Sequence, residues 1–74
     1  STAIAGAIAT YEDYMGEINA ITGSTNAEDA LKRDLRWRLG YAMTQLSKED
    51  ANVAHFVDTV LRRLGDFKKV EGGN

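Results

Sequence analysis

Residues 27–46, AEDALKRDLRWRLGYAMTQL, decide the fold class of this chain. Apolar side chains recur along them at spacings of three and four residues, which is the stripe of an amphipathic helix. The members of this stripe are Leu31, Leu35, Leu39, Ala42, Met43 and Leu46. A short helix with such a stripe is stable in water mainly when other elements cover the stripe, so the sequence predicts a helical bundle.

Comparable stripes lie on both sides of this segment. The stripe before it consists of Ile4, Ile8, Tyr11, Met15 and Ile18, and the stripe after it of Val53, Val57, Val60, Leu61 and Leu64. No stretch alternates with a period of two for long enough to form a sheet, and the sequence has no proline. We therefore predict an all-α protein, a small three-helix bundle forming a single domain over residues 1–74, with helices at 3–22, 27–46 and 48–65 and a frayed tail at 68–74.

Short polar stretches mark the expected helix ends. Residues from Gly23 to Asn26 interrupt the first stripe, and Asn26 is the expected N-cap of the second helix because acidic residues follow it in the first turn. Ser47 is expected to open the third helix, since Ser47 and Asp50 have the spacing of a capping box with Asp in place of Glu or Gln. Gly65 is the expected stop of that helix.

The chain is too short to bury a large core. A chain of this size buries only about 60% of the surface that is exposed when it is unfolded. It has no cysteine and one histidine among its 74 residues, so the sequence offers no disulfide and no zinc or iron site to reinforce the fold. We therefore predict no cofactor and no metal, and we expect self-association or a protein partner to complete the bundle.

The composition also bears on location. No apolar run approaches the roughly 18 residues of a membrane span, and no signal peptide is recognisable. We expect a soluble protein that does not contact membranes. The absence of cysteine favours a reducing compartment, and hence the cytoplasm.

Charge is unevenly distributed along the chain. Residues 1–31 contain five acids and no base, whereas the remainder has nine bases and six acids. This polarity favours complementary contacts, either within one chain or head to tail between chains. The alternative interpretation is that these charges only solvate the outer faces of the helices.

The second helix has a second apolar face. At about 100° per residue, Trp37 lies roughly opposite the centre of the leucine stripe. Tyr41, Ala30 and Thr44 fall beside it, and Arg33 borders them. Aromatic and arginine side chains are enriched in the hot spots of protein interfaces, so we predict a partner interface here. The alternative is that the neighbouring helices clasp the middle helix on both sides and bury these residues.

The first helix carries a lane of small residues away from its isoleucine stripe. The lane consists of Ala5, Ala9, Gly16 and Ala20, and it would let another helix approach closely. The alternative is that alanine is present simply because it is a good helix former. Gly6 and Gly16 favour a packing role, because each glycine costs about 1 kcal/mol relative to alanine inside a helix.

Catalytic chemistry has little support in the sequence. His55 falls opposite the valine stripe of the third helix, where we expect it to be exposed. No cysteine is present, and two of the three serines, Ser24 and Ser47, fall in expected turn or cap positions. We therefore predict that the protein is not an enzyme and has no small-molecule substrate.

Two basic clusters raise the alternative of nucleic-acid binding. The candidate contacts are Lys32, Arg36 and Arg38 in the second helix and Arg62 and Arg63 near the C-terminus. The residues of the first cluster are spread around the helix, and the isoelectric point near 5.2 differs from the basic value typical of DNA-binding domains. Nucleic acid therefore remains a second candidate partner.

A local resemblance adds to this alternative. It is carried by residues 46–51, LSKEDA, followed by Val57, Asp58, Gly65, Asp66 and Val70. This pattern covers about a third of the chain and resembles the helix-turn-helix half of the HU family of bacterial nucleoid proteins. In that family this half supports dimerisation, while a β-sheet and arms that follow it grip DNA. The resemblance implies a dimer and a nucleic-acid context, but it does not assign the chain to the family.

The sequence thus predicts a non-enzymatic helical module for protein–protein interaction. Such a module could be an adaptor, an inhibitor or a small component of an assembly, and it would self-associate or dock on a larger protein.

Overall fold

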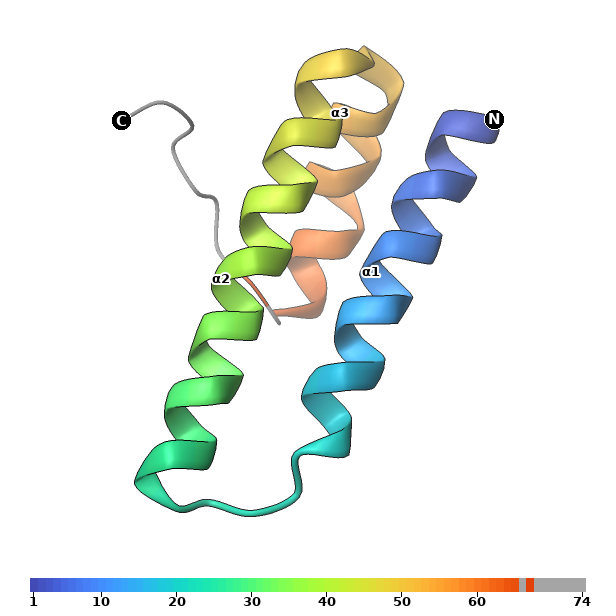
Figure 1. Ribbon diagram of the computed structural model, residues 1–74. Coiled ribbons are helices and arrows are strands. Elements are labelled where there is room, and N and C mark those ends of the chain that lie inside the picture. Colours follow the sequence, from blue (N-terminus) through green and yellow to red (C-terminus); the bar gives the residue numbers. More distant parts are fainter. Residues whose placement is uncertain (66, 68–74) are drawn as a thin grey trace.

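The computed structural model describes residues 1–65 and 67, which form three helices packed together and a short 3₁₀ helix (Figure 1). The elements are α1 (Thr2–Ala20), α2 (Asn26–Glu49), α3 (Ala51–Thr59) and the 3₁₀ helix η1 (Leu61–Leu64). The described residues include no strand, which confirms the all-α three-helix prediction. The predicted frayed tail, residues 68–74, lies outside the described residues.

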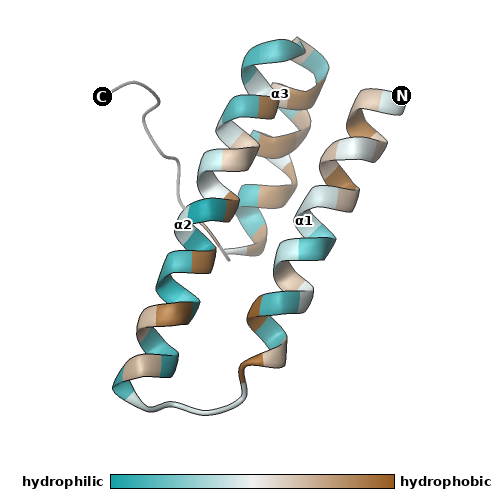
Figure 2. Ribbon diagram, viewed as in Figure 1, coloured by the Kyte–Doolittle hydropathy of each residue, from teal (hydrophilic) through white to brown (hydrophobic). Residues whose placement is uncertain are grey.

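The helices form an elongated and flattened bundle, which measures 39 × 27 × 16 Å along its principal axes. α1 and α3 run in the same direction, and α2 runs antiparallel to both (Figure 1). α3 lies along the C-terminal half of α2 only (Figure 1). Hydrophobic bands recur along α2 between longer hydrophilic stretches (Figure 2), as expected of a helix with one buried stripe.

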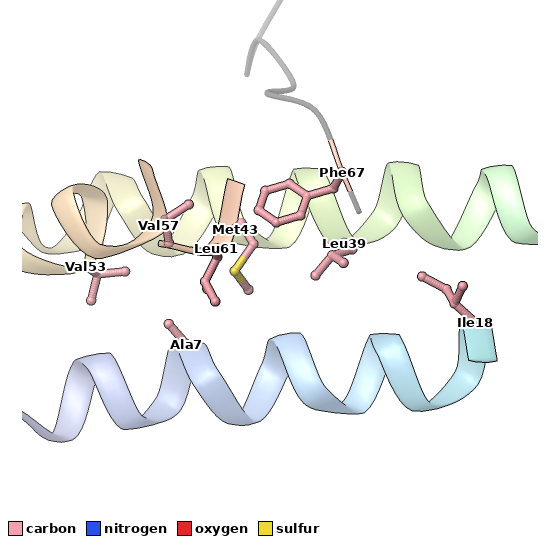
Figure 3. Packing of buried hydrophobic residues seen from close by; sticks show 8 residues of the cluster. All are labelled: Ala7, Ile18, Leu39, Met43, Val53, Val57, Leu61 and Phe67. Carbon is pink, nitrogen blue, oxygen red and sulfur yellow. The ribbon is translucent and has the colours of Figure 1, made fainter. Parts of the chain in front are cut away.

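The core lies where all three helices meet. Its buried apolar members are Ala7, Ile18, Leu39, Met43, Val53, Val57, Leu61 and Phe67 (Figure 3). Full burial of one Val, Leu or Met side chain contributes about 1.5–3 kcal/mol, so the completely buried Leu39, Met43 and Val57 are the main sources of cohesion. Phe67 also stacks obliquely on Tyr11, with ring centroids 6.2 Å apart.

Three members of the predicted stripes are exposed. Leu31, Val60 and Leu64 have exposed fractions of 50%, 42% and 58%. The buried residues of α2 all lie between Leu39 and Thr44, in the half along which α3 runs. The prediction that these three side chains lie in the core is therefore wrong. Leu31 is exposed because α3 runs only along the other half of α2, and Val60 and Leu64 are exposed because the α-helix ends at Thr59 and its stripe does not continue through η1.

The N-cap of α2 is Thr25, and the prediction of Asn26 is wrong by one residue. The Thr25 hydroxyl accepts a hydrogen bond from the Glu28 amide at 3.2 Å, and the Glu28 carboxylate accepts one from the Thr25 amide at 3.2 Å. This reciprocal pair is a full capping box. It satisfies two backbone donors at once, which an Asn26 cap lacking a Glu or Gln three residues later would not do.

The break between α2 and α3 falls at Asp50, so the prediction that Ser47 opens the third helix is also wrong. The Asp50 carboxylate accepts hydrogen bonds from the amides of Asn52 and Val53, at 2.8 and 3.2 Å. A carboxylate is well placed there because the N-terminal end of a helix carries partial positive charge. The Ser47 hydroxyl instead donates to the Met43 carbonyl at 2.7 Å, inside α2.

The third helix ends earlier than predicted. The α-helix stops at Thr59, and Val60 leads into the tighter η1. Gly65 then adopts a left-handed conformation with φ of 80° and ends η1. The prediction of Gly65 as the stop of the third helix is therefore wrong, because the α-helix has already ended at Thr59. The tighter turn leaves Leu61 buried and Leu64 exposed.

Candidate protein interaction surface

Trp37 and Tyr41 form a stacked pair on the outside of α2. They are one helical turn apart, and their rings are nearly parallel, with centroids 5.5 Å apart and an interplanar angle of 14°. Their exposed fractions are 56% and 41%. The alternative in which neighbouring helices bury this pair is therefore excluded by their exposure, and a large aromatic surface is open to contact.

Two of the other predicted interface residues are exposed as well. Ala30 lies two turns and Arg33 one turn before Trp37 on the same side of α2, and both are exposed. We call Ala30, Arg33, Trp37 and Tyr41 the aromatic face of α2. Within the described part of the chain, Arg33 makes no ion pair, so its charge is available to a partner.

Thr44 does not belong to this surface. It is only 7% exposed, and its hydroxyl donates to the Gly40 carbonyl at 2.9 Å. Gly40 is buried too, one turn before Thr44, in the half of α2 that α3 accompanies. The prediction of Thr44 as a partner contact is therefore wrong, because the bundle itself covers this flank of α2.

The small-residue lane of α1 is open along its whole length. Ala5, Ala9, Gly16 and Ala20 are all exposed. A methyl group added at Gly16 would meet no atom within 4 Å, and the same holds for Gly6. Neither glycine is thus required by packing within the bundle.

Two acids flank this lane, a feature that the sequence analysis missed. At about 100° per residue, Glu12 and Asp13 project about 50° to either side of the centre of the lane. Both are exposed, and neither forms an ion pair among the residues that the structure describes. Their helical spacing relative to the lane is a signal that could have identified them.

Three of the five candidate nucleic-acid contacts, Lys32, Arg38 and Arg62, form polar contacts within the chain. Lys32 donates to the Gly23 carbonyl at 3.1 Å, and Arg38 pairs with Asp34 at 2.9 Å. Arg36 and Arg63 are exposed.

Arg62 is the most constrained of the basic residues. Its Nε lies 2.7 Å from an Asp58 carboxylate oxygen, and its guanidinium lies 5.5 Å from the centre of the Phe67 ring. Its Nη1 is buried without a hydrogen-bond partner. These contacts hold the Arg62 side chain of η1 against Asp58 and Phe67, so Arg62 has a structural role.

The described residues hold no cluster of three or more His, Cys, Asp or Glu side chains suited to a metal ion. His55 is exposed, as predicted. The pKa of Glu28 is lowered from its ordinary value of 4.5, chiefly because its carboxylate accepts a hydrogen bond from the Thr25 hydroxyl. None of the described helices combines the length and apolar character that crossing a bilayer requires.

No family model, no curated protein and no solved structure matches this chain. The resemblance of residues 46–70 to the HU family is thus not supported by any family match. The aromatic face of α2 and the α1 lane are therefore the features of the structure that bear on function.

Proposed function

We propose that the protein is a non-enzymatic interaction module that associates with a protein, either itself or a larger partner, through the aromatic face of α2. The observation that supports this proposal is the exposed, stacked pair of Trp37 and Tyr41 beside the unpaired Arg33. Trp, Tyr and Arg are the residue types most enriched in binding hot spots. The proposal includes the cytoplasm as the compartment, in keeping with the cysteine-free composition.

The exposed aromatic area is large enough to matter for binding. Aromatic side chains bury about 150–250 Å² each. At about 25 cal/mol per Å², covering the exposed half of both rings would contribute a few kcal/mol before the costs of association are subtracted.

The rings are also held in place before a partner arrives. Trp37 and Tyr41 lie in the interior of a 24-residue helix, and they stack on each other. Their side chains therefore lose little conformational freedom on binding, which lowers the entropic cost of association.

The test is capture of partners from an extract of the native source, followed by mass identification. The double variant Trp37→Ala, Tyr41→Ala should lose the partners that the wild-type chain captures, while its helical circular dichroism spectrum stays unchanged because both rings are exposed. Leu64→Ala is the matched control, since it removes an apolar side chain of similar exposure from η1. Equal capture by the double variant and the wild type would contradict the proposal.

Nucleic acid is the alternative partner, and the contacts of Lys32, Arg38 and Arg62 count against it. A duplex-binding titration at low and moderate salt separates the two cases. A protein that contacts several phosphates binds duplex tightly at low salt and loses affinity steeply as salt rises. Such a result would favour the alternative over the proposal.

A further inference from the structure

We propose that the partner of the aromatic face is a second copy of this chain, docked head to tail, with α2 of one copy lying on the outer face of α1 of the next. By the outer face of α1 we mean the small-residue lane together with Glu12 and Asp13. This inference rests on the proposed function, because it names the partner of the same aromatic face.

Charge complementarity favours a second copy. The aromatic face carries Arg33, and Arg36 is exposed nearby on the same helix; neither forms an ion pair within the described residues. The outer face of α1 carries Glu12 and Asp13, which are exposed and likewise lack ion pairs in that part of the chain. Each copy thus presents one basic and one acidic surface whose charges are not satisfied internally, and these surfaces attract each other.

The same charges disfavour a symmetric contact of the aromatic face with itself. Arg38 is neutralised by Asp34, which leaves Arg33 as the uncompensated charge of the face. A two-fold contact would place two faces of the same sign together, and like charges across an interface reduce affinity.

The two surfaces also fit in shape. Trp37 and Tyr41 project as bulky rings from α2, whereas the α1 lane offers only alanine and glycine. Gly16 has open space around it, so a ring of the next copy can approach the α1 backbone closely there. This contact gives Gly16 a packing role that the single bundle does not provide.

The contact is proposed as head to tail and not as a reciprocal two-fold pair, so two docked copies leave one α1 face and one α2 face open. Further copies can therefore add, and the assembly continues into a ring or a chain. This property makes the inference testable by complementation between two variants, each of which blocks one face.

The first variant is Trp37→Ala, which removes the larger ring of the aromatic face. The second is Gly16→Arg, which fills the lane with a long charged side chain whose Cβ meets no atom of the bundle within 4 Å. Gly6→Arg is the matched control: it makes the same change on the same helix, also in open space, but about 70° from the centre of the lane. Arginine is a better helix former than glycine, so both arginine variants should remain folded.

Light-scattering mass is then measured over a concentration series of the full chain. The wild type and Gly6→Arg should form assemblies larger than a dimer. Trp37→Ala and Gly16→Arg should each dissociate at concentrations at least tenfold higher than the wild type. An equimolar mixture of these two variants should form particles of twice the chain mass, because one intact α1 face meets one intact α2 face.

Each other outcome overturns part of the argument. A wild type that stays monomeric throughout refutes the second copy as partner and leaves the capture experiment to decide on the proposed function. A Gly16→Arg variant that dimerises like the wild type, while Trp37→Ala does not, shows a symmetric α2 contact and refutes the head-to-tail arrangement. Assembly that is unchanged in Trp37→Ala refutes the aromatic face as the site of self-association and leaves the capture experiment to decide on the proposed function. If circular dichroism shows that Gly16→Arg is unfolded, Ala9→Arg replaces it in the same design.

Discussion

Replacing the two exposed glycines of α1 by alanine should stabilise the folded chain. Gly6 and Gly16 are interior residues of α1, where glycine costs about 1 kcal/mol relative to alanine. A Cβ added at either position meets no atom within 4 Å, so the new methyl group neither clashes nor becomes buried. The change in helix propensity is then the whole effect.

The magnitude follows from these two facts. Each substitution should raise the free energy of unfolding by up to about 1 kcal/mol. The two positions are ten residues apart, about 15 Å along the helix, so their effects should add to about 2 kcal/mol. For a domain of this size, about 1 kcal/mol raises Tm by about 4–8 °C, so the double variant should melt roughly 8–16 °C higher.

The assay is thermal and urea denaturation followed by circular dichroism. It is performed at low protein concentration, because any assembly of the folded chain would itself raise the apparent stability. Gly65→Ala is a control that should lower the free energy of unfolding instead of raising it. Gly65 has φ of 80°, and a side chain in the left-handed region costs about 1–2 kcal/mol, so this variant should melt lower.

A difference between the two helical glycines would refute this reasoning. If Gly6→Ala stabilises and Gly16→Ala does not at low concentration, Gly16 has a contact that the single bundle does not show. If Gly16→Ala stabilises the monomer but weakens assembly at high concentration, the added methyl group obstructs the docking of the next copy. The same variant therefore separates the folding role of Gly16 from its proposed packing role.

Three further perturbations have defined expectations. Leu39→Ala should lower the free energy of unfolding by about 2–5 kcal/mol in urea melts, since Leu39 is completely buried at the centre of the core. Asp50→Ala should cost about 1–2 kcal/mol in the same assay because it removes the cap of α3, whereas Ser47→Ala should change stability by no more than about 0.5 kcal/mol. Thr25→Ala should return the pKa of Glu28, followed by NMR titration, towards 4.5. Because the pKa of Glu28 is lowered in the folded state, its carboxylate stabilises the fold above pH 4.5, and this effect is lost as the pH falls through the folded-state pKa. The loss of stability below pH 4.5 should therefore be smaller in Thr25→Ala than in the wild type.

The three α-helices could be predicted from the sequence because the apolar period of α1, α2 and α3 is unambiguous, whereas the 3₁₀ helix η1 was not predicted. The helix boundaries could not, because several residues were eligible as caps. Asn26 and Ser47 both have good cap side chains, yet Thr25 gains a reciprocal bond from Glu28 and Asp50 satisfies two amides with one carboxylate. Local preference ranks the candidates, but the number of backbone donors that each can satisfy decides between them.

The aromatic face could be predicted only in part, because helical spacing does not show which side of α2 the third helix covers. Helical spacing alone places Trp37 and Tyr41 opposite the leucine stripe, and both are exposed. It places Thr44 beside them as well, although α3 accompanies this half of α2 and Thr44 is buried. Which flank of α2 the third helix occupies depends on the Asp50 turn between α2 and α3, and a stripe analysis of α2 alone contains no information about that turn.

The exposed apolar residues of this bundle have two different origins, and only one of them points to a partner. Leu31, Val60 and Leu64 belong to predicted core stripes. Leu31 is exposed because the 9 residues of α3 span about 14 Å, whereas the 24 residues of α2 span about 36 Å, so α3 does not reach that end of α2. Val60 and Leu64 are exposed because the α-helix ends at Thr59 and its stripe does not continue through η1.

Trp37 and Tyr41 are exposed for a different reason. The two residues flank Leu39 in the sequence, and Leu39 is completely buried, so they lie at a level of α2 where the core is complete. They are exposed because their side chains point away from the core around the axis of α2. No extension of α3 along the existing stripe would cover them, since they belong to a separate face. At this level the bundle is already closed, and the described part of the chain offers no further element to cover the two rings. This is why the aromatic face, rather than the larger set of exposed apolar side chains, is assigned the interaction.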